Sequence, residues 1–275
     1  MAHRVHLPAP ALRQLIRYYV TVEHQLASST LIQPIAARST PLLDFQFGDR
    51  CELFVEDHAN RRVAHSVAVV GAQTFARVQV VSRGNVDSFV VIFQPGGLFK
   101  LLSVPLHSLT DQDYEGRSVM GPGVDELADQ LGASRSAAER VRLSDKYFLE
   151  RSQIPCCSRD ISALAGRLSM HRGSLKVADL AREAGLSVRQ LERRFLEQIG
   201  MSPRMFARVT RFEAALRAKR ENPGLRWTHI AHELGFHDQM HMLRDFRKLS
   251  GETPSSAAIT LDPLVKDEID GTRPR

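Results

Sequence analysis

Residues 180–195, LAREAGLSVRQLERRF, contain the pattern that decides the fold of the C-terminal half of the chain. An apolar-periodic segment runs up to Gly185, and glycine readily adopts the left-handed conformation that ends a helix. Ser187 follows with a side-chain oxygen that can cap a new helix, whose apolar positions recur at Leu191 and Phe195. Two helices joined by a short turn that contains glycine form a helix-turn-helix, which is the structure predicted for this stretch.

The same pattern returns in IAHELGFHDQMHMLRDFRKLS at 230–250. The correspondence requires one inserted residue in the second turn, where Asp238 takes the place of Ser187 as the cap. Such an ordered internal repeat predicts two structural units of the same design. The shared positions are Ala181 and Ala231, Glu183 and Glu233, Gly185 and Gly235, Arg193 and Arg244, Phe195 and Phe246, Gly200 and Gly251, and Pro203 and Pro254.

The segment between the two units, PRMFARVTRFEAALRAKREN, is predicted to be one long helix. It begins with Pro203, a residue favoured in a first helical turn, and it ends before Pro223 and Gly224. At about 1.5 Å per residue, a helix over 204–220 would span roughly 25 Å. Such a spacer could set the second helices of both units on successive major-groove faces of a duplex, about 34 Å apart. Its apolar stripe consists of Phe206, Val209, Phe212, Ala215 and Leu216.

Charge is divided unevenly along the chain. Residues 1–157 contain 16 Lys+Arg and 16 Asp+Glu, whereas residues 158–257 contain 18 against 11, a net charge of +7. The last 18 residues contribute 3 against 4, which restores the whole-chain charge of +6. A basic domain beside a neutral one favours a polyanionic partner for the basic half. We interpret the charged outer faces as surfaces for the major groove of DNA, and a helical hairpin with a solvated basic surface is the alternative.

Residues 160–258 resemble the DNA-binding domain of the AraC/XylS family of bacterial transcription regulators. The resemblance rests on LAREAGLSVRQLERRF, IGMSP, the spacer with its RFEAA, IAHELGFHDQ and FRKLSGETP. It implies an all-α domain of about seven helices and sequence-specific binding of double-stranded promoter DNA. It also implies RNA polymerase as a contact, and activation of transcription more often than repression.

The family's base-reading positions carry over to the second helix of each unit. Arg can bond a guanine edge, Gln an adenine edge, and Glu can accept from a cytosine amine. Met240 departs from the polar residue often found at its position. The base-reading candidates are Arg189, Glu192, Arg193, Gln239, Met240 and Arg244. The phosphate-contact candidates are Ser187, Gln190, Arg194, Arg208, Asp238, His241, Arg247 and Lys248.

The N-terminal half is predicted to be mainly strand up to about residue 105. LLDFQFGD alternates apolar and polar residues, and SFVVIF follows the turn signal SRGN. Later segments, GLFKLLSVPLHSL, VDELADQLGA and SAAERVRLSDKYFLERS, predict helices. By the family arrangement, this half looks like a small cupin-like β-barrel with a helical connector. The predicted fold is α+β, with a sensor and dimerisation domain at 1–157, the DNA-binding domain at 158–258 and a mobile tail at 259–275.

A barrel mouth can hold a small-molecule effector. Packed core is the alternative interpretation for the apolar residues that could line it, Phe45, Phe47, Phe89, Val91 and Phe93. We expect no metal or other cofactor, because His58 and His65 lie seven residues apart around an Arg pair and His107 is remote. Amphipathic helices between about 124 and 151 predict either a homodimer contact or a cover over the barrel.

Other classes of protein are disfavoured. The chain has no apolar run of about 18 residues and its start lacks a secretory signal, so a cytoplasmic protein without membrane contact is expected. Cys51, Cys156 and Cys157 form no disulfide framework, and a redox role of the vicinal pair is the less favoured interpretation. No nucleophile elbow, zinc-protease helix or dinucleotide loop is present. A ligand-responsive transcription regulator is preferred over an enzyme localised by the C-terminal half, and over an architectural or protein-binding module.

Overall fold

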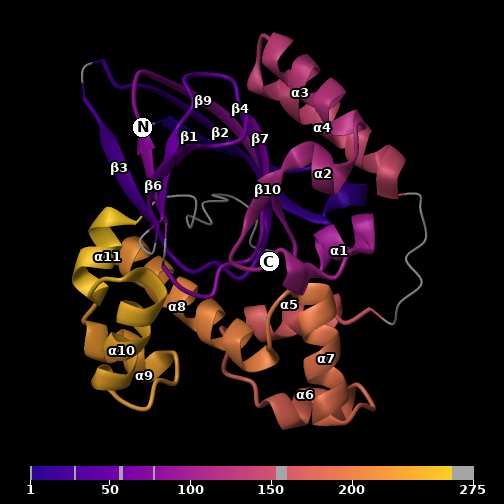
Figure 1. Cartoon of the computed structure of the whole chain (residues 1–275). Coiled ribbons are helices and arrows are strands. Elements are labelled where there is room, and N and C mark those ends of the chain that lie inside the picture. Colours follow the sequence, from indigo (N-terminus) through magenta and orange to yellow (C-terminus); the bar gives the residue numbers. More distant parts are fainter. Residues whose placement is uncertain (1, 28, 56–57, 77, 153–159, 262–275) are drawn as a thin grey trace.

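The chain combines a β-domain with a helical domain. A group of helices covers one side of the β-domain, and the helical domain lies below it in the view of Figure 1. The predicted domain boundary at 157/158, the pair Cys156 and Cys157, and residues 262–275 of the predicted tail lie outside the described residues. The computed structural model describes residues 2–27, 29–55, 58–76, 78–152 and 160–261.

The first of two antiparallel sheets has six strands in the order β1-β2-β9-β4-β7-β10. Its middle is the long pairing of β2 with β9, which runs from Ile16 opposite Phe93 to Gln25 opposite Asn85. The strands are β1 (Ala2–His6), β2 (Ile16–Gln25), β4 (Leu42–Gln46), β7 (Val67–Val70), β9 (Asn85–Phe93) and β10 (Asp113–Glu115).

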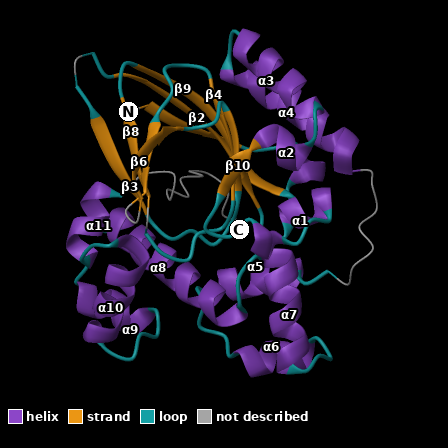
Figure 2. Ribbon diagram, in the orientation of Figure 1, coloured by secondary structure: helices purple, strands orange, loops and turns teal. Residues whose placement is uncertain are grey.

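The second sheet has four strands in the order β3-β8-β5-β6. The two sheets curve around a common interior, as Figure 2 shows. An ion pair between Arg62 on the edge strand β6 and Asp113 on the edge strand β10 ties one sheet to the other. The strands are β3 (Leu31–Ile35), β5 (Glu52–Val55), β6 (His58–Val63) and β8 (Val78–Ser82). The β-rich first half predicted from the strand patterns is thus confirmed.

The outer face of the six-stranded sheet is covered by helices. Because side chains alternate along a strand, Leu43 and Phe45 of β4 point to this covered face, where they pack with Leu127, Leu131 and Phe148. The three predicted helical segments are confirmed, whereas α2 was not expected. The helices are η1 (Pro10–Leu12), α1 (Gly97–Leu102), η2 (Leu106–Ser108), α2 (Gly116–Met120), α3 (Gly123–Ala133) and α4 (Ala137–Ser152).

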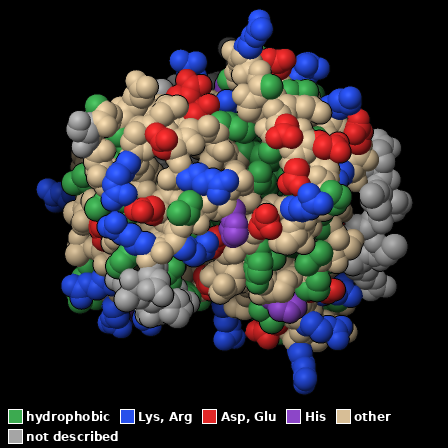
Figure 3. Space-filling model, turned by 45° about the horizontal axis from the view of Figure 1, so that its top comes forward, with side chains coloured by type: hydrophobic (Ala, Val, Ile, Leu, Met, Phe, Trp, Pro, Cys, Tyr) green, Lys and Arg blue, Asp and Glu red, His purple; other side chains and the backbone are tan. Residues whose placement is uncertain are grey.

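Acidic and basic side chains are interspersed on the face of the molecule shown in Figure 3. This distribution agrees with the balanced charge of residues 1–157, which contain equal numbers of both signs. The excess of positive charge belongs to the helical domain.

Seven helices follow within residues 160–261, as the family resemblance implied. The long spacer α8 runs from Pro203 to Glu221, one residue longer at each end than the predicted span, and it links the two halves of the domain (Figure 1). Pro203 lies in its first turn, after the cap Ser202. The helices are α5 (Ser162–Met170), α6 (Val177–Glu183), α7 (Val188–Ile199), α8 (Pro203–Glu221), α9 (Trp227–Glu233), α10 (Gln239–Ser250) and α11 (Pro254–Thr260).

The apolar stripe of α8 forms the centre of the helical core. Phe206 packs edge-to-face on Phe195 of α7, and Phe212 packs in the same way on Phe246 of α10. Trp227 joins this core through Phe246, with 5.6 Å between the ring centroids. Both helix-turn-helix units are therefore held against one helix, which sets their relative position.

Candidate nucleic-acid interface and cavity

The first helix-turn-helix unit is formed by α6 and α7. Gly185 between them has φ +63°, the left-handed conformation expected of the turn. Ser187 caps α7 in a reciprocal pair of hydrogen bonds, because its hydroxyl accepts from the amide of Gln190 and its own amide donates to the side chain of Gln190. The predicted cap is thus confirmed, and both side chains serve the helix start.

The second unit, formed by α9 and α10, is built in the same way. Gly235 has φ +67°, and the carboxylate of Asp238 accepts from the amide of His241 at 2.6 Å. This hydrogen bond, followed by the one with the His237 ring, lowers the pKa of Asp238. An ionised carboxylate at this position also suits the positive end of the helix dipole.

The predicted base-reading side chains lie on the outer faces of α7 and α10. Five of the six are exposed and Glu192 is half-buried, while the inner faces carry fully buried Leu191 and Met242. Arg189 and Arg193 have no ion-pair partner among the residues that the structure describes. The exposed five are Arg189, Arg193, Gln239, Met240 and Arg244.

The predicted phosphate contacts divide into two groups. Arg247 and Lys248 are exposed in the last turn of α10, whereas Arg194 is half-buried on α7. The four others on these units cluster at the two helix starts, where backbone amides favour anions. These four are Ser187, Gln190, Asp238 and His241.

Arg208, another predicted phosphate contact, has an ion-pair partner inside the helical domain. Its guanidinium forms an ion pair with Asp245 at 2.7 Å, and the Asp245 side chain is only 5% exposed. A buried carboxylate requires a charged partner, since leaving it alone in the interior is costly. The spacer residue Arg208 therefore holds α10 on α8, and the structure does not place it among the exposed basic side chains.

A cavity of about 190 Å³ lies between the two sheets of the β-domain. Both sheets contribute apolar walls, with Val22 and Val90 from one and Leu31, Leu53 and Val80 from the other. Polar residues share the lining. They include His24, Asp44, Gln46, Gln73, Asp87 and Asp113.

The predicted pocket residues do not line this cavity. Phe45, Phe89, Val91 and Phe93 are fully buried in the core between the six-stranded sheet and its covering helices, and Phe47 packs against that core. These five residues therefore agree with the alternative interpretation, in which they belong to the packed core. Adjacent strand residues face opposite sides of a sheet, so the cavity receives the alternate residues of LLDFQFGD, Leu42, Asp44 and Gln46, together with Asp49 at the end of that segment.

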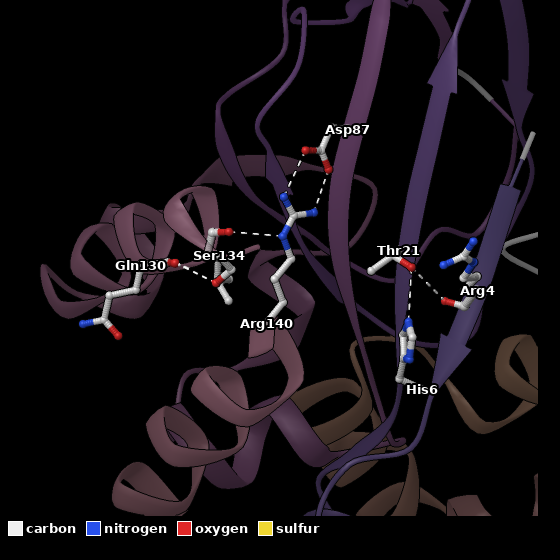
Figure 4. A network of polar contacts seen from close by, with 8 residues as sticks. Arg4, His6, Thr21, Asp87, Gln130, Ser134 and Arg140 are labelled. Atoms are coloured by element: carbon white, nitrogen blue, oxygen red, sulfur yellow. Dashed lines mark hydrogen bonds and ion pairs between the residues drawn. The ribbon is translucent and has the colours of Figure 1, made fainter. Parts of the chain in front are cut away.

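One wall of the cavity is anchored to α4. The guanidinium of Arg140 donates to both carboxylate oxygens of Asp87, at 2.6 and 2.9 Å, and its Nε donates to the Leu131 carbonyl (Figure 4). The same guanidinium lies 4.4 Å from the ring centre of Phe47. Such a two-pronged pair is a strong and directional contact. It fixes the helical cover to a strand that faces the cavity.

Cys51 also lines the cavity. Burial, together with the nearby charge of Asp44, raises the pKa of its thiol to about 11. The thiol is therefore protonated and weakly nucleophilic at neutral pH. Among the described residues, no cluster of three or more His, Cys, Asp or Glu side chains has the arrangement of a metal site.

Comparison with known families agrees with this geometry. Residues 180–258, which contain both helix-turn-helix units, match a family described as a helix-turn-helix domain. This is an AraC-type DNA-binding domain. Residues 4–115, the β-domain, match a domain of unknown function (DUF6597). An AraC-type helix-turn-helix domain in the C-terminal part of the chain supports a role in DNA binding and transcription regulation.

Solved structures with a similar fold extend over both domains. ToxT from Vibrio cholerae O395 is 12% identical with a TM-score of 0.50, over 88% of this chain and 98% of that chain. ToxT from strain SCE256 with a bound unsaturated fatty acid is 13% identical with a TM-score of 0.50, over 88% and 95% of the two chains. ToxT bound to (E)-4-(8-methylnaphthalen-1-yl)but-3-enoic acid is 11% identical with a TM-score of 0.50, over 95% and 100%. At such low identity the similarity shows the fold alone.

A search of curated protein sequences finds no match to this chain. In the described part of the chain, every helix is too short or too polar to cross a membrane.

Proposed function

We propose that α7 and α10 enter two neighbouring major-groove segments of one DNA duplex. The observation that carries the proposal is the equivalence of Arg193 and Arg244, which occupy the same position in the two units and are both exposed. Each lies on the face opposite a buried apolar stripe, so the helix can approach a groove without disturbing the core. The other base contacts proposed are Arg189 and Glu192 in the first unit and Gln239 and Met240 in the second.

The spacer supports this arrangement. Helix α8 has 19 residues, which corresponds to about 28 Å. This length is close to the roughly 34 Å that separates successive major-groove faces on one side of a duplex. Arg194, Arg247 and Lys248 would then contact phosphates beside the reading helices, and the amides at both helix starts would do the same.

Selection of bound duplexes from a random pool tests the proposal most directly. Arg193→Ala and Arg244→Ala should each weaken binding to the selected site by about 1–3 kcal/mol and relax the preference at one base pair. Arg247→Ala should weaken selected and random duplexes alike and reduce the salt slope by about one. Arg117→Ala, which removes one exposed positive charge from the β-domain side, is the matched control. Sequence reading by α7 and α10 would be refuted if none of these variants distinguished the selected duplex from random duplexes and all of them bound equally well.

The cavity is the proposed site of a small-molecule effector. Its apolar walls and few polar groups are typical of ligand sites, and ToxT, which has a similar fold, has been solved with a fatty acid. A ligand that binds this cavity should change the affinity of the full chain for its DNA site, and DNA should change the affinity for the ligand by the same factor. A ligand that binds with no effect on DNA affinity would leave the cavity without a regulatory role.

Two macromolecular partners are proposed as well. Pairing of two chains through α3 and α4 is one use of these amphipathic helices, and sedimentation of the full chain tests it. RNA polymerase is the second partner. A promoter-reporter assay that shows activation, and loses it when an exposed residue beside the DNA-reading surface is changed, tests that contact.

A further inference from the structure

The polar end of the cavity has a definite structure. Three short segments lie side by side there, and we call them the floor: residues 36–40, 71–74 and 110–113. Arg38 and Gln73 exchange two backbone hydrogen bonds of 2.9 Å, and the amide of Asp111 donates to the carbonyl of Ala72 at 2.9 Å. Arg38, Gln73 and Asp111 all line the cavity, as does Asp113 at the end of the third segment.

Two acceptors at the floor lack a donor. Gln73 is only 8% exposed, and its Oε1 atom has no hydrogen-bond partner among the described residues. Oδ2 of Asp113 is in the same situation, while Oδ1 pairs with Arg62. A buried acceptor without a donor destabilises the fold by roughly 1–3 kcal/mol. A ligand that donates hydrogen bonds at this place would remove that penalty.

The charge of the lining favours a cation. Among the described lining residues, five are Asp and one is Arg. Arg140 and Arg62 pair with Asp87 and Asp113 from outside the lining, which leaves five carboxylates against three guanidinium groups. The Arg38 guanidinium is held by the carbonyls of Thr40 and Gly71. A positive ligand is therefore complementary to the site, whereas a carboxylate is not.

The size of the cavity limits the rest of the ligand. Its volume of about 190 Å³ slightly exceeds that of an apolar cavity of about 150 Å³ that accommodates benzene. Away from the floor, valine and leucine side chains form apolar walls beside the polar side chains of His24, Asp44, Gln46 and Asp87. The body of the ligand should thus be apolar and about as large as one ring with a short chain.

We propose that the effector is a compact apolar molecule with a protonated amine, which binds with the amine on Gln73 at the floor, near the carboxylates that the floor contributes to the lining. This inference rests on the proposed role of the cavity as the effector site. The proposed ligand carries a positive head group, whereas the ligands in the ToxT structures are carboxylic acids.

Three small molecules of similar shape test, with the full chain, whether the cavity prefers a positively charged ligand. 2-Phenylethylamine, 2-phenylethanol and phenylacetate differ mainly in the charge of the head group, and ligand-observed NMR with thermal shift at millimolar concentration measures their binding. The amine should bind best. Gln73→Met should weaken amine binding about tenfold while leaving the chain at least as stable, because the substitution removes a buried amide oxygen that has no donor among the described residues.

Ser88→Ala is the matched control, since Ser88 lines the cavity on β9, opposite Gln46 and away from the floor. It should leave the preference for the amine unchanged. Equal or tighter binding of phenylacetate, or no binding of any probe, would overturn the ligand class. Neither result would bear on the proposed DNA binding, because binding of the selected duplex is measured separately on the same protein sample.

A different observation concerns the opposite side of the floor, which holds the AraC-type domain. The amide of Ala37 donates to the carbonyl of Leu249 in α10 at 2.7 Å. The hydroxyl of Thr110 donates to the carbonyl of Gly200, the C-cap of α7, at 2.6 Å. Both DNA-reading helices are thus bound by the floor at their C-terminal ends.

The spacer is held as well. The amide and hydroxyl of Ser39 both donate to the carboxylate of Glu213 on α8, at 2.8 Å each. Ala37 and Ser39 flank Arg38, so one extended segment presents residue 38 to the cavity and its two neighbours to the helical domain. In the third segment, Thr110 contacts α7 while Asp111, with φ +59°, lines the cavity.

We infer that the floor couples the cavity to the spacing and orientation of the two reading helices. A head group that displaces Arg38 or Asp111 must move their neighbours Ala37, Ser39 and Thr110, which hydrogen-bond α10, α8 and α7. Coupling between two binding sites is reciprocal, so DNA bound to the outer faces must also alter the floor. The consequence is measurable without knowledge of the natural effector.

Hydrogen exchange of the full chain, with and without its selected duplex, tests this coupling. The amides of segments 36–40 and 110–113 should change their exchange rate about fivefold or more on DNA binding. In a Ser39→Ala and Thr110→Val double variant, DNA should still bind and the response of the floor should fall. An unchanged floor in the natural chain, while α7 and α10 respond to DNA, would overturn the inference. A full response in the double variant would overturn it too.

Discussion

The C-cap glycines of α7 and α10 provide a matched test of how the domains are joined. Gly200 ends α7 with φ +93°, and Gly251 ends α10 with φ +75°. A Cβ atom on Gly200 would lie 2.8 Å from the Thr110 hydroxyl and 3.1 Å from the Leu106 carbonyl, both in the β-domain half. A Cβ atom on Gly251 would meet nothing within 4 Å. The same substitution therefore perturbs the domain contact in only one of the two positions.

The magnitudes follow from these contacts. A left-handed alanine costs about 1–2 kcal/mol, and this term applies to both variants. Gly200→Ala should also break the hydrogen bond from Thr110, which contributes about 1 kcal/mol, and force the Leu106 carbonyl away. We expect Gly251→Ala to lower the free energy of unfolding by about 1–2 kcal/mol and Gly200→Ala by about 2–4 kcal/mol.

Urea unfolding of the full chain, followed by circular dichroism and by the fluorescence of Trp227, measures these changes. Trp227 is the single tryptophan of the chain and lies beside Phe246 of α10, so it reports on the second unit. Adding Thr110→Ala to Gly200→Ala should restore part of the loss, because the closest contact is removed. Equal losses in the two glycine variants, or no recovery in the double variant, would refute a tight contact between the floor and α7.

Three further predictions concern single contacts. Arg140→Leu should lower the free energy of unfolding by about 3 kcal/mol, because it leaves Asp87 without its partner, and Arg140→Leu with Asp87→Leu should recover much of that loss in the same denaturation assay. Ser187→Ala should destabilise α7 by about 1 kcal/mol through loss of the capping box, and helicity by circular dichroism should show a smaller loss for Ser187→Gly. Burial raises the pKa of Asp160, but hydrogen bonds from Lys100 and Ser162 outweigh it and the net pKa is lowered. Its contribution to stability is therefore present above the ordinary Asp value of about 3.9 and is lost as pH falls through the lowered value, and an acid titration of unfolding with Lys100→Met as comparison checks this dependence.

Much of the C-terminal domain is predictable because its signals are local. Helix starts at Ser187 and Asp238 and turns at Gly185 and Gly235 depend on the hydrogen bonding and backbone freedom of a few adjacent residues. The apolar stripe of α8 has a period that only one helical face satisfies. The repeat then shows that the same local solution is used twice.

The location of the cavity cannot be predicted from local sequence patterns. Phe45 and Asp44 are neighbours in one strand, and periodicity shows only that they face opposite sides of a sheet. Whether the aromatic side meets helices or an open interior depends on where α3 and α4 pack. In this structure α3 and α4 pack on the face that carries Leu43 and Phe45, so Phe45 is buried in the core and Asp44 faces the cavity.

The sequence likewise does not show whether a given basic residue is an exposed charge or the partner of a buried carboxylate. Arg208 and Arg193 are both basic residues on predicted helices, but Arg208 neutralises the buried Asp245, 37 residues away in the chain. Local pattern was sufficient for the two helix-turn-helix units, since their hydrogen bonds close within a few residues. The cavity, its floor and the pairing of Arg208 arise from contacts between distant segments, and such contacts depend on how whole elements pack rather than on the order of neighbouring residues.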